Sequence, residues 1–265
     1  MARVLVASMQ LTFKRFGERV RGRWVRVLPM LLFLCIWQIA ASALESKTLP
    51  PPSAVLTTLW QEIQTGDLLF HLGMTLRRVA IRFTAAMLIG IALGLLMGRY
   101  KGGDCRLDNF LILGLNIPAL VTIILCYIWF GLSEAAAVLA VTLNKIPVVA
   151  ISLREGARAV DQSLLQVARV YRLSRWDTFF KVYLPQLTPY LLGSARNGLA
   201  LIWKIVLVVE LLGRSDGVGF QIGSLFHFFN ITGILAYTLA FALVIFGIEA
   251  LFLRPLETRL NRWRS

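Results

Sequence analysis

The residues of this sequence best placed to do chemistry are charged side chains inside long apolar runs. Five stand out, namely Lys145, Arg196, Lys204, Glu210 and Glu249. A charge at membrane depth is costly, so it usually faces a partner charge or a water-filled cavity. We interpret the first four as candidates for lining such a cavity. The alternative is structural, with Lys204 in an interhelical ion pair with Glu210 or Glu249, and Arg196 reaching the inner membrane surface.

Residue types that serve catalysis or metal binding are scarce. Two histidines, His71 and His227, and three cysteines, Cys35, Cys105 and Cys126, are present, and their spacing matches no metal site or disulfide framework. The phosphate-binding pattern Gly-x-x-x-x-Gly-Lys-Ser/Thr does not occur. We therefore predict that this chain is not an enzyme and binds no metal or cofactor itself. Both histidines are interpreted as interfacial polar residues near the outer surface.

The composition indicates helices that cross a membrane. Apolar residues make up 57% of the 265 residues, only 16% are charged, and the mean hydropathy is +0.70. Apolar runs of about 20 residues are long enough to cross a hydrocarbon core, and a barrel would show shorter alternating segments. We predict an all-α membrane protein of about six transmembrane helices. The runs are Val25–Leu44, Val79–Gly98, Phe110–Phe130, Ala135–Leu153, Thr188–Leu212 and Ile231–Leu253.

The distribution of Lys and Arg predicts the orientation. The net charge of +14 would suggest a nucleic-acid partner in a soluble protein, but four segments on one side of the membrane carry 20 of the 28 basic residues. The three segments on the other side carry four, a strong positive-inside bias. We predict no nucleic-acid partner and two cytoplasmic termini. The basic segments are 1–26, 99–108, 154–187 and 254–265; the outer ones are 45–78, 131–134 and 213–230.

The first apolar run allows two interpretations. We expect residues 1–24 to form a basic cytoplasmic segment and residues 25–265 the membrane domain. The alternative is a cleaved signal peptide, because Ala41-Ser42-Ala43 resembles a signal-peptidase site. Leu49 and the three prolines after it then break the chain, and Ser53 can cap an interfacial helix that runs to about Gln64.

Glycine and proline residues occur at informative positions inside the later apolar runs. Gly90, Gly94 and Gly98 recur every four residues, a pattern that lets two membrane helices approach closely. Pro118 and Pro147 each lie inside an apolar run, where proline kinks or locally opens a helix. Pro118 is therefore a further candidate for lining a cavity.

The long basic segment 154–187 predicts two short amphipathic helices at the cytoplasmic surface. Asp161 can cap the first helix, and Leu164, Leu165, Ala168 and Tyr171 follow at helical spacing. The second helix begins near Arg175 or Trp176, and Leu184-Pro185 is expected to end it. The segment is either an ordinary interfacial hairpin or an element that docks a cytoplasmic partner.

This segment resembles the coupling motif of ABC-importer permeases, Glu-Ala-Ala-x-x-x-Gly followed by hydrophobic-x-Leu-Pro. Residues 49–254 are similar to the nitrate, sulfonate, taurine and bicarbonate branch of that family. This chain departs from the motif at two places: Gln166-Val167-Ala168 stands where the motif has Glu-Ala-Ala, and Arg172 stands where it has glycine. The final Leu-Pro of the motif is present as Leu184-Pro185. Arg172 implies a continued helix or a different turn. Supporting stretches are LPPPSAV, HLGMTLRRVAIRF, GIALGLLMG, IPALVTIILCYIWFG, VYLPQLTPYLLGSARNGLALIW, VVEL and GVGFQIG.

The resemblance implies a type I importer fold in the inner membrane. Two permease chains, as a homodimer or a heterodimer, would form a pathway for a small anionic solute. Two cytoplasmic ATPase subunits would bind ATP and Mg²⁺, and an external solute-binding protein would deliver the solute. Arg169, Arg172 and Arg175 would contact acidic residues of the ATPase or lipid headgroups. The residues assigned to ATPase coupling are Asp161, Leu164, Leu165, Gln166, Val167, Ala168, Arg169, Tyr171, Arg172, Leu184 and Pro185.

A different class of function remains as an alternative, a stand-alone channel or secondary carrier. Such a protein would need no ATPase and would show inverted repeats with broken helices.

Overall fold

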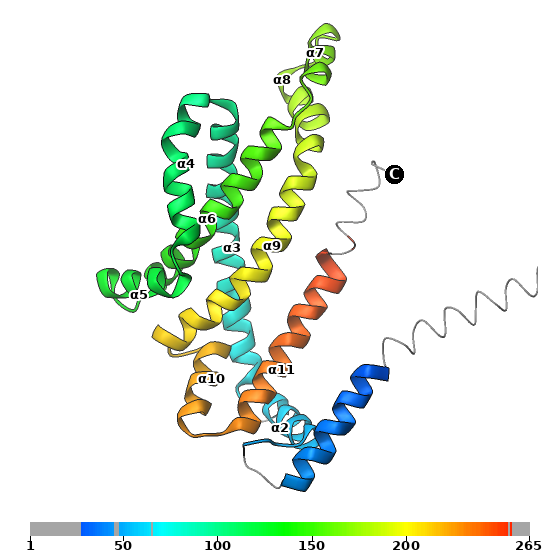
Figure 1. Cartoon of the computed structure of the whole chain (residues 1–265), viewed down its shortest axis with the longest axis vertical. Helices are drawn as coiled ribbons and strands as arrows, with labels where there is room; N and C mark the ends of the chain where they lie inside the picture. Colours follow the sequence, from blue (N-terminus) through cyan, green and yellow to red (C-terminus); the bar gives the residue numbers. More distant parts are fainter. Residues whose placement is uncertain (1–27, 45–47, 65, 254, 256–265) are drawn as a thin grey trace, which may run out of the picture.

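A computed structural model describes residues 28–44, 48–64, 66–253 and 255, and within them the regular structure is entirely helical. The long helices run side by side along the longest axis of the molecule (Figure 1). The segment 154–187, predicted to be cytoplasmic and called the cytoplasmic hairpin below, lies at one end of that axis, and the opposite end is called the outer end. The elements are a helix at Leu28–Leu44, α2 (Pro52–Gln64), α3 (Leu68–Arg99), α4 (Lys101–Asn116), α5 (Ala119–Phe130), α6 (Glu134–Arg158), α7 (Gln162–Val170), α8 (Arg175–Asp177), the π-helix η1 (Thr178–Tyr183), α9 (Leu184–Gly213), α10 (Val218–His227), α11 (Ile231–Ile248) and the π-helix η2 (Glu249–Leu253).

Helices α3 and α6 form the most extensive helix pair, and glycines make their close approach possible. A Cβ atom at Gly94 would lie 2.5 Å from the carbonyl oxygen of Ala150, and one at Gly98 would lie 2.5 Å from the Cβ atom of Ala157. Real Cβ atoms do not approach so closely, so larger residues would separate the helices. The predicted small-residue face is therefore confirmed.

The main apolar core lies between α3, α6, α9, α10 and α11, and α2 covers one edge of it. Val141, Val206 and Ala236 are fully buried there, and Trp203 packs edge to face on Phe241 with 5.8 Å between ring centroids. A smaller cluster at the cytoplasmic end joins Ala157, Val160 and Leu187. This second cluster fixes the hairpin on the ends of α6 and α9.

Two prolines inside apolar runs behave differently. At Pro118 the chain bends by 100° between α4 and α5, a break rather than a kink. The residue before proline avoids helical geometry, and Ile117 is accordingly extended, with φ −74° and ψ 122°. Pro147, by contrast, lies within the continuous helix α6. The break at Pro118 turns α5 away from the long axis (Figure 1).

Three helices are long and apolar enough to cross a membrane, or four if the bent pair α4–α5 counts as one span. The three are α3, α6 and Ile231–Phe252. Helix α9 and the helix Leu28–Leu44 are not among them, so the six-span topology stays a prediction. The basic segment 1–24 lies outside the described residues. The interfacial helix α2 begins at Pro52, one residue before the predicted cap, and the Ser53 amide donates to Gln38 Oε1 at 3.2 Å.

Candidate functional sites

The cytoplasmic hairpin begins with a capped helix. Asp161 accepts hydrogen bonds from the Ser163 amide at 2.8 Å and the Ser163 hydroxyl at 2.6 Å. These bonds favour the carboxylate and lower the pKa of Asp161 below its ordinary value. The amide of Asp161 donates in turn to Gln186 Oε1 at 2.8 Å, which ties the start of α7 to α9. The predicted cap at Asp161 is confirmed.

Helix α7 ends in a left-handed turn at Arg172. Its φ is +52°, and its amide donates to the carbonyl of Arg169 at 3.0 Å. The amide of Leu173 reaches back to the carbonyl of Ala168, also at 3.0 Å. This is the helix ending that glycine favours. The expectation of a continued helix or a different turn is therefore wrong, because the chain makes the glycine-type turn with an arginine.

The second half of the hairpin runs directly into α9. Ser174 caps α8 by accepting from the Asp177 amide at 3.0 Å, and Lys181 pairs with Asp177 at 2.6 Å, which lowers the pKa of Asp177. The prediction that Leu184-Pro185 ends this helix is wrong. The π-helix η1 ends at Tyr183 and α9 begins at once at Leu184, so the helical chain continues through Pro185.

The faces of α7 separate into an inner and an outer set. Ala168 is buried, and Leu165 packs partly buried against the small core at the cytoplasmic end. Leu164, Val167 and Tyr171 are exposed, at 47%, 49% and 76% of their surface. Gln166, Arg169 and Arg172 are exposed as well, Leu184 is half-buried and Pro185 is exposed.

A groove of about 420 Å³ between α7 and the η1–α9 junction is lined by Leu164, Val167, Ala168, Tyr171, Leu173, Lys181, Val182, Pro185 and Gln186.

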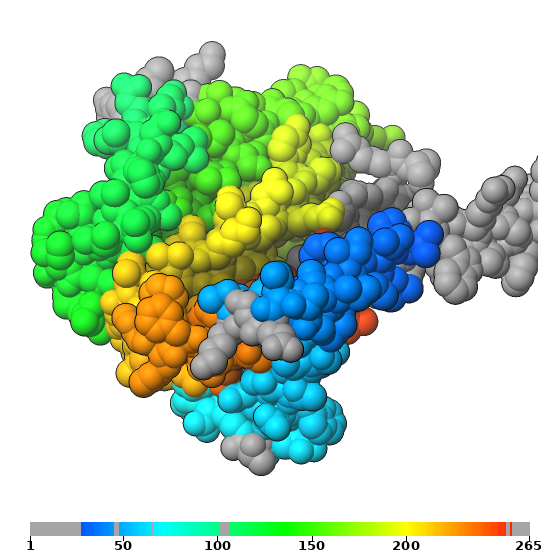
Figure 2. Space-filling model, turned by 60° about the horizontal axis from the view of Figure 1, so that its bottom comes forward, coloured from blue at the N-terminus to red at the C-terminus, as the bar shows by residue number. Residues whose placement is uncertain are grey.

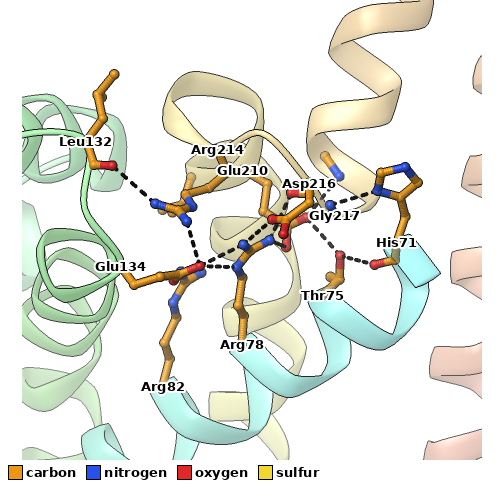
Figure 3. A network of polar contacts seen from close by, with 12 residues as sticks. His71, Thr75, Arg78, Arg82, Leu132, Glu134, Glu210, Arg214, Asp216 and Gly217 are labelled. Carbon is orange, nitrogen blue, oxygen red and sulfur yellow. Dashed lines mark hydrogen bonds and ion pairs between the residues drawn. The ribbon is translucent and has the colours of Figure 1, made fainter.

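A second site, the outer cluster, is built around Arg78 of α3 (Figure 3). Its guanidinium, 2% exposed, pairs with Glu134 of α6 at 2.6 Å, with Glu210 of α9 at 3.0 Å and with Asp216 of the α9–α10 loop. Glu134 also pairs with Arg82 and Arg214, each at 3.1 Å. The cluster thus has three arginines and three carboxylates, which gives charge balance at a buried junction of three helices and a loop.

The same cluster holds the start of α10 through backbone amides. Gly217 donates to His71 Nδ1 at 3.0 Å, Val218 to Thr75 Oγ1 at 2.8 Å, and Gly219 to Glu210 Oε2 at 3.0 Å. These amides would otherwise have no helical partner. Gly217 has φ +101°, and a Cβ atom there would lie 2.4 Å from the Glu210 carboxyl carbon.

The two histidines lie in different environments, and only His71 departs from its interpretation. His71 is 7% exposed and bonded within the outer cluster, so the interpretation as an interfacial residue is wrong. His227 is exposed and lines an open outer cavity of about 970 Å³ together with Arg214 and Phe226.

The charged candidates at membrane depth are not brought together in one place. Glu210 belongs to the outer cluster, and Arg196 pairs with Glu249 at 3.1 Å. Both glutamates therefore have arginine partners, and Lys204 pairs with neither, which corrects the structural alternative. Lys204 is exposed, and Lys145 is 1% exposed. Pro118 lies exposed at the bend between α4 and α5.

Sequence reasoning found Glu210 but missed its partners. Arg78, Arg82, Glu134 and Asp216 lie near the predicted ends of apolar runs, where charges are ordinary. One signal was available, because Arg78 and Arg82 are four residues apart and so share one face of an amphipathic helix. Their carboxylate partners lie 52 to 138 residues away along the chain. No local pattern reveals such pairs.

Long apolar helices, with a basic hairpin at one end and a charge-balanced cluster at the other, define a helical membrane protein. The comparison with protein families makes this specific: the model described as "binding-protein-dependent transport system inner membrane component" matches residues 86–254, and the chain belongs to this family. The family assignment and the predicted branch are confirmed.

Several relatives cover nearly the whole chain. The aliphatic sulfonates transport permease protein SsuC of Bacillus subtilis is 31% identical over 93% of this chain and 90% of its own length. The taurine transport system permease protein TauC of Escherichia coli is 29% identical over 97% and 98%. The nitrate import permease protein NrtB of Synechocystis is 31% identical over 85% and 83%.

Two solved structures support the predicted fold. One is a crystal structure of an amino acid ABC transporter with histidines, with a TM-score of 0.60, 22% identity, and coverage of 76% of this chain and 97% of that one. The other is the MetNI methionine ABC transporter in inward-facing form, with a TM-score of 0.60, 18% identity, and coverage of 77% and 99%. The type I importer permease fold is thereby confirmed.

Proposed function

We propose that this permease docks cytoplasmic ATPase subunits through α7 and, with a second permease chain, forms the pathway of an importer for a small anionic solute. The observation that carries the docking proposal is the exposed apolar set Leu164, Val167 and Tyr171 beside a groove of about 420 Å³. Apolar side chains at this exposure on a hairpin outside the membrane are typical of a protein interface. ATP and Mg²⁺ would be bound by the ATPase subunits.

The continuity of the hairpin with α9 supports a mechanical role. Helix α9 has 30 residues, about 45 Å at 1.5 Å per residue, and follows η1 without a break. Its inner end carries the hairpin, and Glu210 near its outer end belongs to the outer cluster. A displacement of α7 by a closing ATPase pair would therefore move α9 against the cluster. Two discrete arrangements of α9 relative to α3 and α6 would give alternating access.

The solute class is inferred from the relatives and from charge. The relatives named above transport sulfonates, taurine and nitrate, and each of these carries an anionic group. Lys204 is an exposed cation of α9. An external solute-binding protein would deliver the solute to the outer end, where the cavity lined by Arg214 and His227 opens. Pro118, Lys145 and Arg196 remain candidates for the pathway.

The arginines of the hairpin support two kinds of contact. Arg169, Arg172 and Arg175 are all exposed. Acidic residues at the rim of the ATPase and anionic headgroups of the inner leaflet would both bind guanidinium groups at this surface. Loss of ATPase binding in an arginine variant at low salt would favour the protein contact over the lipid contact.

Co-purification with the ATPase subunit tests the docking proposal. Leu164→Asp combined with Tyr171→Asp places two charges on the exposed apolar set, and Leu165 is left intact because it packs inward. We expect the wild-type chain to retain the ATPase and the double variant to lose it while staying in the membrane. Gln162→Asp adds a charge at an exposed polar position of the same helix and is the matched control. An ATPase that binds wild type and double variant equally would contradict docking through α7.

A further inference from the structure

Two lysines, Lys145 of α6 and Lys204 of α9, have no counter-ion among the residues that the structure describes. The other described charges on α6, α9, α11 and η2 are all in ion pairs, from Glu134 in the outer cluster to Arg196 with Glu249. Lys145 and Lys204 pair with no carboxylate in the part of the chain that the structure describes. Lys204 differs from Lys145 because its side chain is exposed. In Figure 2, α9 runs as an open yellow band between the green helices and the blue helix Leu28–Leu44.

Lys204 lies well inside the predicted span Thr188–Leu212, away from both ends of α9. It lies nine residues before the end of α9 at Gly213, about two and a half turns or 14 Å along the axis, and about 30 Å from Leu184. Lysines that extend to the membrane surface lie near helix ends. An unpaired ammonium group this far inside is strongly disfavoured in lipid. This face of α9 therefore points to water or to a polar partner.

The residues around Lys204 are suited to a passing solute. Gly193, Asn197, Ala200 and Lys204 are all exposed and follow one another at helical spacing along one face. Small side chains leave room beside the helix, and a Cβ atom at Gly193 would meet nothing within 4 Å. Asn197 and Lys204 supply hydrogen-bond donors. Glu249 lines the same pocket as Asn197 and Ala200, but it pairs with Arg196 at 3.1 Å, and Glu210 is fully buried in the outer cluster. Neither carboxylate is therefore paired with Lys204.

Lys145 of α6 adds to the positive potential near Lys204 from the buried side of α9. Its Cε atom is 3.6 Å from the place that a Gly198 Cβ atom would occupy, so its stem crosses α9 at this glycine. Gly198 and Lys204 are six residues apart, about 9 Å along the helix. Two uncompensated cations in a region of low dielectric attract anions and repel cations over a longer range than in water.

We propose that Lys204 binds the anionic group of the solute within the pathway, so that this face of α9 is an oxyanion site of the permease itself. The inference rests on the proposed function and deepens it. The ligand class is a small monovalent oxyanion, such as a sulfonate or nitrate, which offers several acceptors to an ammonium group. Lys204 would thus let the permease favour anionic solutes inside the pathway, after the solute-binding protein has released them.

The test measures the electrostatic potential beside Lys204 without requiring the natural solute. Ala200→Cys places a thiol one turn from Lys204 on the same face, in a chain whose three cysteines are replaced by alanine. The whole transporter, with its ATPase, is reconstituted in vesicles with and without ATP. Two methanethiosulfonates of similar size serve as probes, one with a sulfonate and one with a trimethylammonium group. The readout is the ratio of their reaction rates with the thiol.

We expect the sulfonate reagent to be favoured when Lys204 is present. At about 6 Å even the dielectric of water gives a unit charge a threefold effect on each rate, so Lys204→Gln lowers the anion-to-cation ratio about tenfold. Lys204→Arg keeps the ratio, and Lys204→Glu inverts it. Gly73→Cys, an exposed position of α3 with no atom within 4 Å of the new Cβ, is the control whose ratio stays the same in all variants.

Two results would overturn the proposal. One is a ratio at Ala200→Cys that Lys204→Gln leaves unchanged. The other is a thiol that reacts only with a lipid-soluble maleimide, which would show that this face contacts lipid. ATPase co-purification is measured on the same vesicles, so either result with the ATPase still bound rejects the oxyanion site and leaves the permease function intact.

Discussion

Replacing Arg172 by glycine should stabilise the cytoplasmic hairpin. Arg172 holds a left-handed conformation, with φ +52°, at the end of α7. For a residue with a Cβ atom this conformation costs about 1 kcal/mol or more, and glycine adopts it without that strain. The guanidinium group makes no ion pair with any residue that the structure describes. The variant should therefore remove backbone strain without losing a contact.

The expected gain is about 1 kcal/mol in the local free energy of opening, which corresponds to a roughly fivefold slower amide exchange. Two amides report on it most directly, those of Arg172 and Leu173, which donate to the carbonyls of Arg169 and Ala168 at 3.0 Å. Leu173 is preferred because its own side chain is unchanged. Hydrogen–deuterium exchange with peptide-level mass spectrometry, on the transporter in detergent or nanodiscs, gives the rate.

Arg172→Ala separates the backbone from the charge. Alanine removes the guanidinium group but keeps the Cβ atom, so Leu173 should exchange as in the wild type. Equal slowing in the alanine and glycine variants would refute the strain argument and place the effect in charge repulsion among Arg169, Arg172 and Arg175. Faster exchange in the glycine variant would show that Arg172 holds the turn by a contact. ATPase co-purification in the same two variants tells whether the charge serves docking.

Three further results are expected. Gly219→Ala places a Cβ atom 2.2 Å from the Leu207 carbonyl oxygen and should lower stability by about 1–3 kcal/mol in a thermal-shift assay, whereas Gly223→Ala, 3.6 Å from Leu211, should change it little. Glu210→Gln leaves Arg78 with less negative charge at a fully buried site and should lower the free energy of unfolding by about 3 kcal/mol, against almost nothing for the exposed Glu155→Gln. Hydrogen bonds hold the pKa of Asp161 below its ordinary value of 3.8, so the cap stabilises α7 above about that pH and is lost as pH falls through the lowered value. The protection factor of the Ser163 amide, its exchange rate relative to the intrinsic rate at the same pH, should therefore fall only below about pH 4 in the wild type and lose this pH dependence in Asp161→Asn.

Local patterns predicted those elements whose physics is local. The cap at Asp161 and the break at Pro118 depend on neighbours in the sequence, and the spacing of Gly90, Gly94 and Gly98 marks a close-packing face without naming α6 as its partner. The ending at Leu184-Pro185 was misjudged because the chain passes there from the π-helix η1 into the α-helix α9 instead of leaving the helix. Arg172 was misjudged because a turn fixed by Ala168 and Leu173 tolerates a strained residue.

Long-range pairing explains the rest. The sequence offers Glu210 and Glu249 as partners for Lys204, and only the packed helices show that Arg78 and Arg196 occupy them. This pairing leaves Lys204 without a carboxylate partner among the described residues, which changes the role that we assign to it. A lysine with a carboxylate partner would be structural, whereas an exposed lysine without one at membrane depth requires water or a ligand. Two parts of α9 therefore have different roles, because the charges near Glu210 are balanced and the charge of Lys204 is not. The end of α9 near Glu210 is held fast by ion pairs, and the face around Lys204 stays open to an anion.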